Sequence, residues 1–175
     1  VFAGFRPTDA GDHSRTNIGA YVDLEANVLR NLLVGLAGRT EHYSDFGSTT
    51  NGKATARFEF FPGYAIRGAV STGFRAPSLG QEFFSSTATN LLNNVLIENR
   101  TFPVESDVAK ALGAQPLKAE KSVNASVGVA LAPLSNLSFT ADYYHITIDD
   151  RIVLSGNFLN LGTFLASKGF PGITA

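Results

Sequence analysis

Residues 17–28, Asn-Ile-Gly-Ala-Tyr-Val-Asp-Leu-Glu-Ala-Asn-Val, decide the fold. The even positions are all apolar, whereas the odd positions hold asparagine, acidic residues, glycine and tyrosine. Successive side chains of a β-strand point to opposite sides, so a repeat of two indicates a strand with one wetted side. This stretch therefore predicts a β-strand with one apolar and one polar side.

The same alternation returns in five further stretches, namely residues 32–43, 53–61, 64–75, 121–132 and 137–148. Each predicted strand has about nine to thirteen residues, against about five to six for the usual strand of a globular protein. Six long strands of one kind predict an all-β fold of antiparallel, up-and-down strands.

The placement of charge agrees with this interpretation. Four of the stretches carry more than one charged residue, and in each the charges share one side: Asp23 and Glu25; Arg39 and Glu41; Lys53, Arg57 and Glu59; Arg67 and Arg75. The opposite side is rich in small residues: Ala20, Gly38, Ala54, Ala56, Gly68 and Ala125. A charge that faces lipid costs roughly 2–4 kcal/mol at the middle of a bilayer. One side of the predicted sheet therefore suits contact with lipid.

The connections between the stretches alternate in length. Short connections of turn-forming residues lie at 29–31, 62–63 and 133–136. Long connections cover 44–52, 76–120 and everything after 149. Within them, residues 106–114 predict a short helix with Ser106 or Asp107 near its cap, and residues 161–168 predict another. One end of the sheet is therefore expected to have tight hairpins, and the other large loops.

A soluble ligand-binding barrel would show the same alternation with its apolar side inward. Strand length favours a membrane barrel instead, because about nine to eleven tilted residues cross a bilayer. Aromatic residues also gather near the strand ends, as in interfacial girdles: Phe58, Phe60, Phe61 and Tyr64 at the short-turn end, and Tyr43, Phe46, Phe74, Tyr143 and Tyr144 at the long-loop end. The sequence thus predicts part of a transmembrane β-barrel, about six strands wide.

Composition excludes several other classes. The 175 residues are 44% hydrophobic and 17% charged, with a formal net charge of −1 and no cysteine. Without cysteine there is no disulfide framework, thiolate zinc site or iron–sulfur cluster, and a near-zero net charge argues against a nucleic-acid partner. The longest apolar run, residues 32–38, is far shorter than the roughly 18 residues of a spanning helix. No cofactor is predicted, and no catalytic motif points to an enzyme.

The segment Gly-Phe-Arg-Ala-Pro-Ser-Leu at residues 73–79 resembles a segment characteristic of TonB-dependent outer-membrane receptors. Three further segments stand in the order of that family: Glu-His-Tyr-Ser-Asp-Phe-Gly at 41–47 with Asn-Gly-Lys at 51–53, Leu-Lys-Ala-Glu-Lys-Ser at 117–122, and Ala-Asp-Tyr-Tyr-His-Ile-Thr-Ile-Asp-Asp-Arg-Ile at 141–152. Together they cover most of residues 15–157.

The resemblance implies a barrel of about 22 strands closed around an N-terminal plug. Against that pattern, residues 1–175 show no plug, TonB box, terminal aromatic strand, initiator methionine or signal peptide. We therefore expect residues 1–175 to be a partial barrel domain, with the plug domain and the remaining strands absent. Two unpaired sheet edges would keep such a fragment from being stable alone in lipid.

Six charged residues are candidates for a lumen-facing or ligand-binding site: Arg39, Glu41, Arg57, Glu59, Arg67 and Arg75. Arginines inside a barrel could attract an anionic ferric chelate. Alternatively, opposite charges on neighbouring strands could simply neutralise one another and contact the plug, which is the interpretation we favour. The histidines His13, His42 and His145 and the pair Asp149 and Asp150 have no spacing that requires a metal, so no metal site is predicted.

The resemblance implies a receptor of the bacterial outer membrane that imports a scarce nutrient, most often a ferric siderophore, with energy supplied through TonB. Its partners would be outer-membrane lipid and lipopolysaccharide, the TonB complex through the missing plug, and a small metal chelate or another nutrient. Loops at residues 76–120 and 150–175 would form part of the recognition surface. A passive porin-like channel is the first alternative, and a soluble ligand-binding β-barrel the second.

Overall fold

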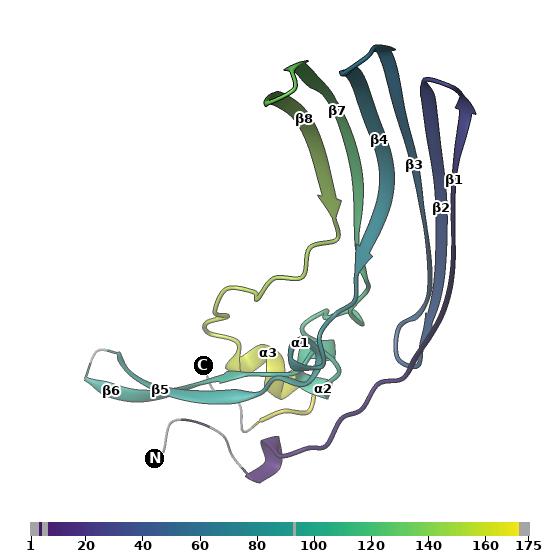
Figure 1. The fold of residues 1–175 in the computed structure, drawn as a ribbon. Helices are drawn as coiled ribbons and strands as arrows, with labels where there is room; N and C mark the ends of the chain where they lie inside the picture. Colours follow the sequence, from purple (N-terminus) through teal and green to yellow (C-terminus); the bar gives the residue numbers. More distant parts are fainter. Residues whose placement is uncertain (1–3, 5–6, 93, 172–175) are drawn as a thin grey trace. The chain divides into compact units, whose positions relative to one another are not determined.

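The computed structural model describes residue 4, residues 7–92 and residues 94–171. The chain divides into two compact units. One, the wall unit, consists of residues 15–76 and 119–151; the other, the loop unit, consists of residues 1–14, 77–118 and 152–175. The strands of the wall unit and the short elements of the loop unit are labelled in Figure 1.

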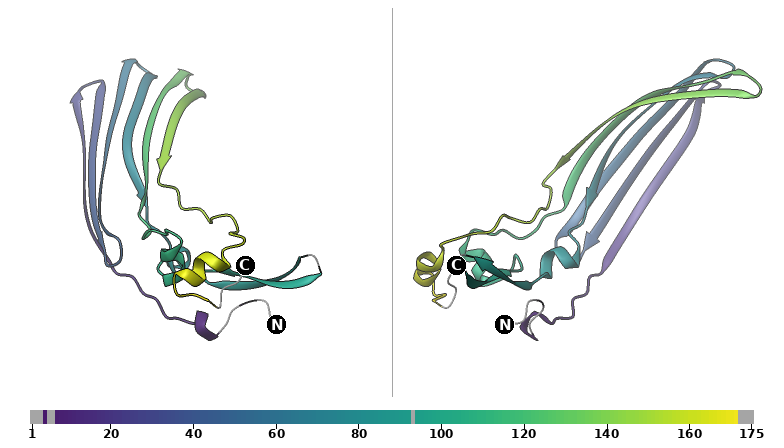
Figure 2. Two further views of the ribbon diagram at one scale, coloured as in Figure 1. Left: turned by 180° about the vertical axis from the view of Figure 1, so that it is seen from behind. Right: turned by 90° about the vertical axis from the view of Figure 1, so that its left-hand side faces the viewer.

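Six strands of the described residues form the main sheet of the wall unit. In spatial order they are β1 (Asn17–Leu29), β2 (Leu32–Tyr43), β3 (Gly47–Phe61), β4 (Tyr64–Arg75), β7 (Glu120–Leu134) and β8 (Leu137–Asp149). Every neighbouring pair is antiparallel. Figure 2 shows this sheet as a single curved layer. The predicted all-β fold of up-and-down strands is confirmed.

The predicted long loop at residues 44–52 is wrong. β3 begins at Gly47, so that only residues 44–46 connect it to β2. The first residues of β3 pair with β2 in continuous register, from Tyr43 with Gly47 to Gly38 with Gly52. These residues, Gly-Ser-Thr-Thr-Asn-Gly, lack apolar side chains on both sides, so alternation could not reveal the strand.

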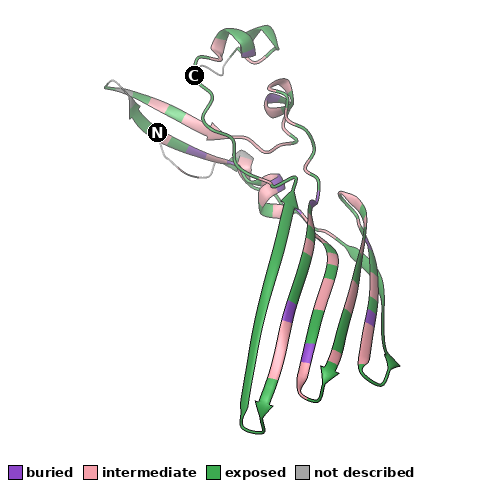
Figure 3. Ribbon diagram, turned by 90° about the horizontal axis from the view of Figure 1, so that it is seen from above, coloured by how far each residue is buried: buried purple, intermediate pink, exposed green. Residues whose placement is uncertain are grey.

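The two sides of the main sheet differ as the sequence predicts. Even-numbered residues of β1 to β4, such as Leu24 and its partner Leu36, form the apolar face, and odd-numbered residues form the polar face. Apolar side chains on this face are exposed: Ile18 by 79%, Leu24 by 64% and Val70 by 58%. Figure 3 shows exposed and intermediate residues along nearly the whole length of the strands. The sheet therefore has no core of its own, and its apolar face requires another apolar medium.

Aromatic residues were predicted at both ends of the strands. The prediction is confirmed at the short-turn end and is partly wrong at the long-loop end. Near the turn at 62–63, the ring of Phe60 lies 5.9 Å from that of Phe61 and 6.3 Å from that of Tyr64. Tyr143 and Tyr144, however, lie in the middle of β8, where Tyr143 pairs with Val127 and Tyr144 with Ser126. Tyr144 therefore lies on the polar face.

The turn between β3 and β4 depends on glycine. Gly63 has a backbone φ of +80°, a conformation that residues with a Cβ atom rarely adopt. A Cβ there would also lie 2.9 Å from the carbonyl oxygen of Ala132, whose N–H donates to the carbonyl of Gly63 at 2.7 Å. The Pro-Gly turn thus joins β3 to β4 and also contacts β7.

The loop unit contains a two-stranded hairpin and short helices: η1 (Pro7–Asp9), α1 (Leu79–Phe83), β5 (Ser86–Leu92), β6 (Val95–Thr101), α2 (Asp107–Ala111) and α3 (Gly162–Ser167). The predicted helices at 106–114 and 161–168 are confirmed with narrower bounds. The Oγ of Ser106 caps α2 by accepting a hydrogen bond from the N–H of Ala109. Neither α1 nor the hairpin was predicted. Among the described residues, no helix combines the length and hydropathy needed to cross a membrane.

Candidate functional site

All six candidate residues lie on the polar face of the main sheet, and each is in an ion pair. Arg39 pairs with Glu41, and Arg57 with Glu59. Arg67 and Arg75 instead pair with Asp142 and Glu120, which come from other strands. The structure therefore brings the candidates together as four separate pairs along the sheet.

Glu41 is the most enclosed carboxylate of the set, with 4% of its surface exposed. It accepts hydrogen bonds from Arg39 and, at 3.1 Å, from the side-chain amide of Asn17. Its register partner on β1 is Gly19, where a Cβ would lie 2.9 Å from the Cγ of Glu41. The absence of a side chain at Gly19 therefore provides the space that this carboxylate occupies.

Glu59 links β3 to the turn that follows. One carboxylate oxygen accepts from Arg57 at 3.1 Å, and the other accepts from the N–H of Gly63 at 3.0 Å. This pair lies within one strand and fixes the start of the Pro-Gly turn, so its role is at least partly structural.

Arg67 reaches across a whole strand. Its Nε donates to Asp142 at 2.9 Å and its Nη2 donates at 2.5 Å, so the contact between β4 and β8 is bidentate. The residue between them on β7 is Gly128, the register partner of both. A Cβ on Gly128 would lie 1.9 Å from a carboxylate oxygen of Asp142. Glycine at this position is therefore required for the ion pair.

Arg75 and Glu120 join the two ends of the longest insertion. They are direct register partners, with 3.5 Å between the Nη1 of Arg75 and a carboxylate oxygen of Glu120. β4 ends at Arg75 and β7 begins at Glu120, so the pair closes the base of the segment between these strands.

The sequence alone did not identify the partners Asp142 and Glu120. Asp142 falls within the predicted strand at 137–148, but its pairing with Arg67 depends on the register across β7. Glu120 lies one residue before the predicted strand at 121–132, although its position opposite the last charge of β4 follows once β4 and β7 are paired. Register, which alternation does not determine, was the missing information.

A further ion pair that the sequence did not reveal joins Arg15 to Asp45, in the turn between β2 and β3. The guanidinium of Arg15 also lies over the rings of Tyr43 and Phe46, at 5.7 and 5.3 Å from their centroids. Burial raises the pKa of Asp45, but hydrogen bonds from Arg15 and from the N–H of Phe46 outweigh burial and hold that pKa below its usual value. Asp45 is therefore held in its charged form.

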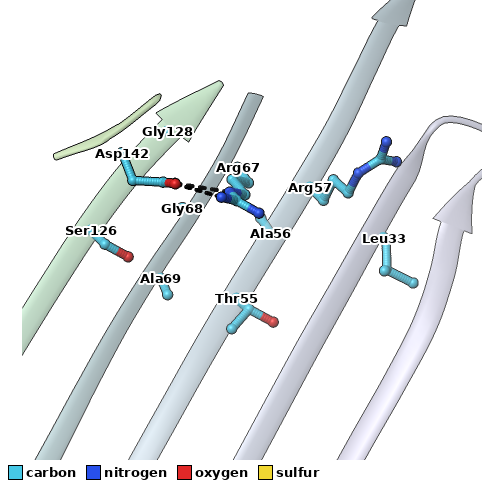
Figure 4. A pocket seen from close by; sticks show the side chains of 10 residues that line it. All are labelled: Leu33, Thr55, Ala56, Arg57, Arg67, Gly68, Ala69, Ser126, Gly128 and Asp142. Atoms are coloured by element: carbon cyan, nitrogen blue, oxygen red, sulfur yellow. Dashed lines mark hydrogen bonds and ion pairs between the residues drawn. The ribbon is translucent and has the colours of Figure 1, made fainter. Parts of the chain in front are cut away.

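A hollow of about 230 Å³ lies on the polar face and is lined by residues of β2, β3, β4, β7 and β8. Figure 4 shows the residues that line it: Leu33, Thr55, Ala56, Arg57, Arg67, Gly68, Ala69, Ser126, Gly128 and Asp142. Two of the six candidates, Arg57 and Arg67, line this hollow. Its floor consists of small residues, and its charged groups are the two arginines and Asp142.

Each of the three histidines has a neighbour of another type. His13 stacks on Phe83 with 3.7 Å between ring centroids, His42 is 2.9 Å from the hydroxyl of Ser48, and His145 is 3.3 Å from that of Thr147. Across the described part of the chain, no group of three histidine or carboxylate side chains could hold a metal ion.

In the loop unit, a buried carboxylate fastens the residues before β1 to the hairpin. Asp9, whose side chain is 1% exposed, accepts hydrogen bonds from Ser85 at 2.8 Å and from Arg100 at 2.9 Å. Gly4 also forms a bridge with Thr87 on the outer edge of β5. Residues far apart in sequence thus form one loop structure.

Comparison with known proteins points to one family. Residues 1–166 match the family described as TonB dependent receptor-like, beta-barrel. No curated protein sequence matches the chain.

Solved structures that resemble the chain include two siderophore receptors and a ferric enterobactin receptor. The chain resembles PirA from Acinetobacter baumannii with a TM-score of 0.62 and 19% identity, over 81% of this chain and 20% of that one. It resembles PirA from Pseudomonas aeruginosa with a TM-score of 0.59 and 17% identity, over 77% and 24% of the two chains. The chain resembles a mutant of the ferric enterobactin receptor PfeA from Pseudomonas aeruginosa with a TM-score of 0.61 and 14% identity, over 83% of this chain and 20% of that one. The chain thus spans about a fifth to a quarter of the length of these structures.

Proposed function

Because the chain belongs to the TonB-dependent receptor family, in its β-barrel domain, we propose that it forms part of the wall of a bacterial outer-membrane receptor. This receptor imports a scarce nutrient, a ferric siderophore in the first instance, with energy supplied through TonB. Residues 1–175 form a partial barrel domain, and the plug and remaining strands belong to the rest of the receptor.

The observation that carries the proposal is the apolar band on the main sheet. Every second residue of each strand lies on the apolar face. These residues are all apolar or glycine over residues 32–38, 64–70, 123–131 and 137–143. These runs have about seven to nine residues, against about nine to eleven for a tilted strand that crosses a bilayer. The next residues on that face are polar: Thr40, Thr72, Lys121 and His145. Such a continuous apolar band, bordered by polar residues, supports contact with lipid.

Aromatic residues stand at both borders of this band. Phe61 is 67% exposed at the short-turn end, and Phe74 lies on the same face of the sheet, one residue before the end of β4. Tyrosine and phenylalanine at such borders are typical of membrane barrels. The short turns then face the periplasm, and the long connections leave the strands at the extracellular side.

The polar face lines the lumen in this arrangement. Arginines paired with carboxylates give that wall many hydrogen-bond donors with little net charge, which suits contact with the plug and with an anionic chelate. Arg39, Glu41, Arg57, Glu59, Arg67 and Arg75 are then lumen-facing residues.

Uptake of radioactive iron tests this function. The intact gene is expressed in an iron-limited strain that lacks its own siderophore receptors, with ferric enterobactin supplied as one probe among several ferric siderophores. We expect uptake of at least one ferric siderophore, and its loss in a matched strain without TonB. Uptake that persists without TonB would contradict active transport.

Two measurements separate the alternatives. A steady conductance of the intact purified protein in a planar bilayer would favour the porin-like channel, whereas a plugged receptor is expected to stay closed. Recovery of the intact protein in the soluble fraction, without detergent, would favour the soluble binding barrel.

A further inference from the structure

The two sides of β8 exchange polarity near the middle of the strand. Up to Tyr143, residues on the apolar face are apolar and residues on the polar face are polar. Beyond Tyr143 the pattern is reversed, and the residues on the apolar face are polar: His145, Thr147 and Asp149. Those on the polar face are large and mostly apolar, and together they form the inner ridge: Tyr144, Ile146 and Ile148.

The inner ridge is exposed in the described sheet. The exposed fraction is 70% at Tyr144, 52% at Ile146 and 46% at Ile148. An antiparallel strand with one apolar and one polar side normally buries the apolar side and turns the polar side to water. The second half of β8 has this pattern, with its apolar side on the polar face of the sheet. The ridge therefore requires an apolar surface to cover it.

Neighbouring strands do not provide this cover. The register partners of the ridge on β7 are small and polar: Ser126, Asn124 and Ser122. The side-chain amide of Asn124 donates to the hydroxyl of Ser71 at 3.4 Å and to that of Ser122 at 3.3 Å, so these groups bond to one another within the wall. On its other side β8 is an edge of the described sheet. A strand that paired there would place its side chains beside the ridge and not over it.

The surroundings of the ridge carry no unbalanced charge. The three ridge residues and their register partners are all uncharged. Asp142, two residues before the ridge on the same face of β8, is already in its bidentate contact with Arg67. A charged chelate on the ridge would lose water without gaining an opposite charge. The ridge therefore suits an uncharged, apolar partner.

We propose that an uncharged, apolar segment of the same receptor, from outside residues 1–175, covers the inner ridge. The chain spans about a fifth to a quarter of the solved structures that it resembles, so most of such a receptor lies outside these residues. A scarce cargo would leave the ridge bare for most of the time, whereas a segment of the receptor covers it permanently. The cargo argument and the assignment of the polar face to the interior both rest on the proposed function.

Photo-crosslinking in the intact receptor tests this cover. Benzoylphenylalanine replaces Ile146 in one variant and Thr147 in a matched control, because adjacent side chains of a strand point to opposite sides. After illumination of cells without added siderophore, mass spectrometry identifies the peptides that are joined. From position 146 we expect a crosslink to a receptor segment outside residues 1–175 that is not the strand paired with β8. From position 147 we expect no such crosslink.

Several results would overturn the proposal. These are no crosslink from position 146, a crosslink confined to residues 1–175 or to the strand paired with β8, and a crosslink that forms only to added siderophore. Position 146 joined to lipid, with position 147 joined to the receptor, would reverse the two faces and contradict the proposed function as well. Iron uptake that persists without TonB, with the expected crosslink present, would count against the proposed function alone.

A second measurement serves where the bulky crosslinker prevents folding. Ile146→Val and Ile146→Thr have the same shape and both suit a strand, but only threonine places a hydroxyl on the ridge. Under an apolar cover, the unfolding equilibrium constant of Ile146→Thr should exceed that of Ile146→Val by about fivefold or more. Urea unfolding of the intact receptor in lipid vesicles compares the two. Equal constants would show that the ridge faces water, and so would overturn the proposal.

Discussion

Arg67 and Asp142 hold β4 and β8 together across an intervening strand. Their bidentate contact, at 2.9 and 2.5 Å, passes over Gly128 of β7, where any side chain would meet the carboxylate. Three neighbouring strands are thus tied by one ion pair in addition to their backbone ladders.

Gly128→Ala is expected to destabilise the receptor by about 1–3 kcal/mol, since the added Cβ meets both Asp142 and the carbonyl of Ala141, at 1.9 and 2.8 Å. Urea unfolding of the intact receptor in lipid vesicles measures the change. Gly38→Ala is the control, because the nearest atom to its added Cβ, on Val22, is 4.0 Å away. Equal stability of the two variants would show that the ion pair between Arg67 and Asp142 does not stabilise the receptor.

A charge at Leu36 tests which face meets lipid. Leu36→Arg places a cation in the apolar band and is expected to cost roughly 2–4 kcal/mol near the middle of the bilayer. Ala37→Arg, one residue along the same strand, places the same cation on the polar face and is expected to cost much less. The same unfolding assay compares them, and equal costs would contradict the assignment of the two faces.

The pair between Arg15 and Asp45 predicts a dependence on pH. The pKa of Asp45 is held below its usual value of 3.8. The stabilisation is therefore fully present above that value and is lost as pH falls through the lower pKa of the folded protein. Unfolding of wild type and Asp45→Asn, measured from neutral pH downward, should show wild type more stable near pH 7. A difference that grew on acidification would contradict this sign.

Asp9 is expected to control the integrity of the loop unit. Asp9→Ala leaves Arg100 and Ser85 without a buried acceptor, and so weakens the attachment of the residues before β1 to the hairpin. Limited proteolysis of intact cells should cut this segment severalfold faster in the variant. Asp12→Ala, an exposed acidic residue of the same segment, is the control and should leave the cutting rate unchanged.

Most strands of the wall unit could be predicted from the alternation of apolar and polar residues. In strands with one apolar and one polar face, this alternation is present in the sequence itself. The start of β3 escaped prediction because Gly47 to Gly52 carry no apolar residue on either side. The hairpin of β5 and β6 was not predicted because its residues lack a regular alternation of apolar and polar side chains. In the candidate site, the residues on the polar face were predictable, whereas the contact between Arg67 and Asp142 depended on the register of three strands.

The closure between Arg75 and Glu120 has a consequence for how such a chain can change. The two residues are direct partners, so the 44 residues between them leave the wall and return to it at adjacent points. Replacement, lengthening or shortening of this segment leaves the register of β4 and β7 untouched. This segment can therefore diversify as an exchangeable cassette on an unchanged pairing of β4 with β7.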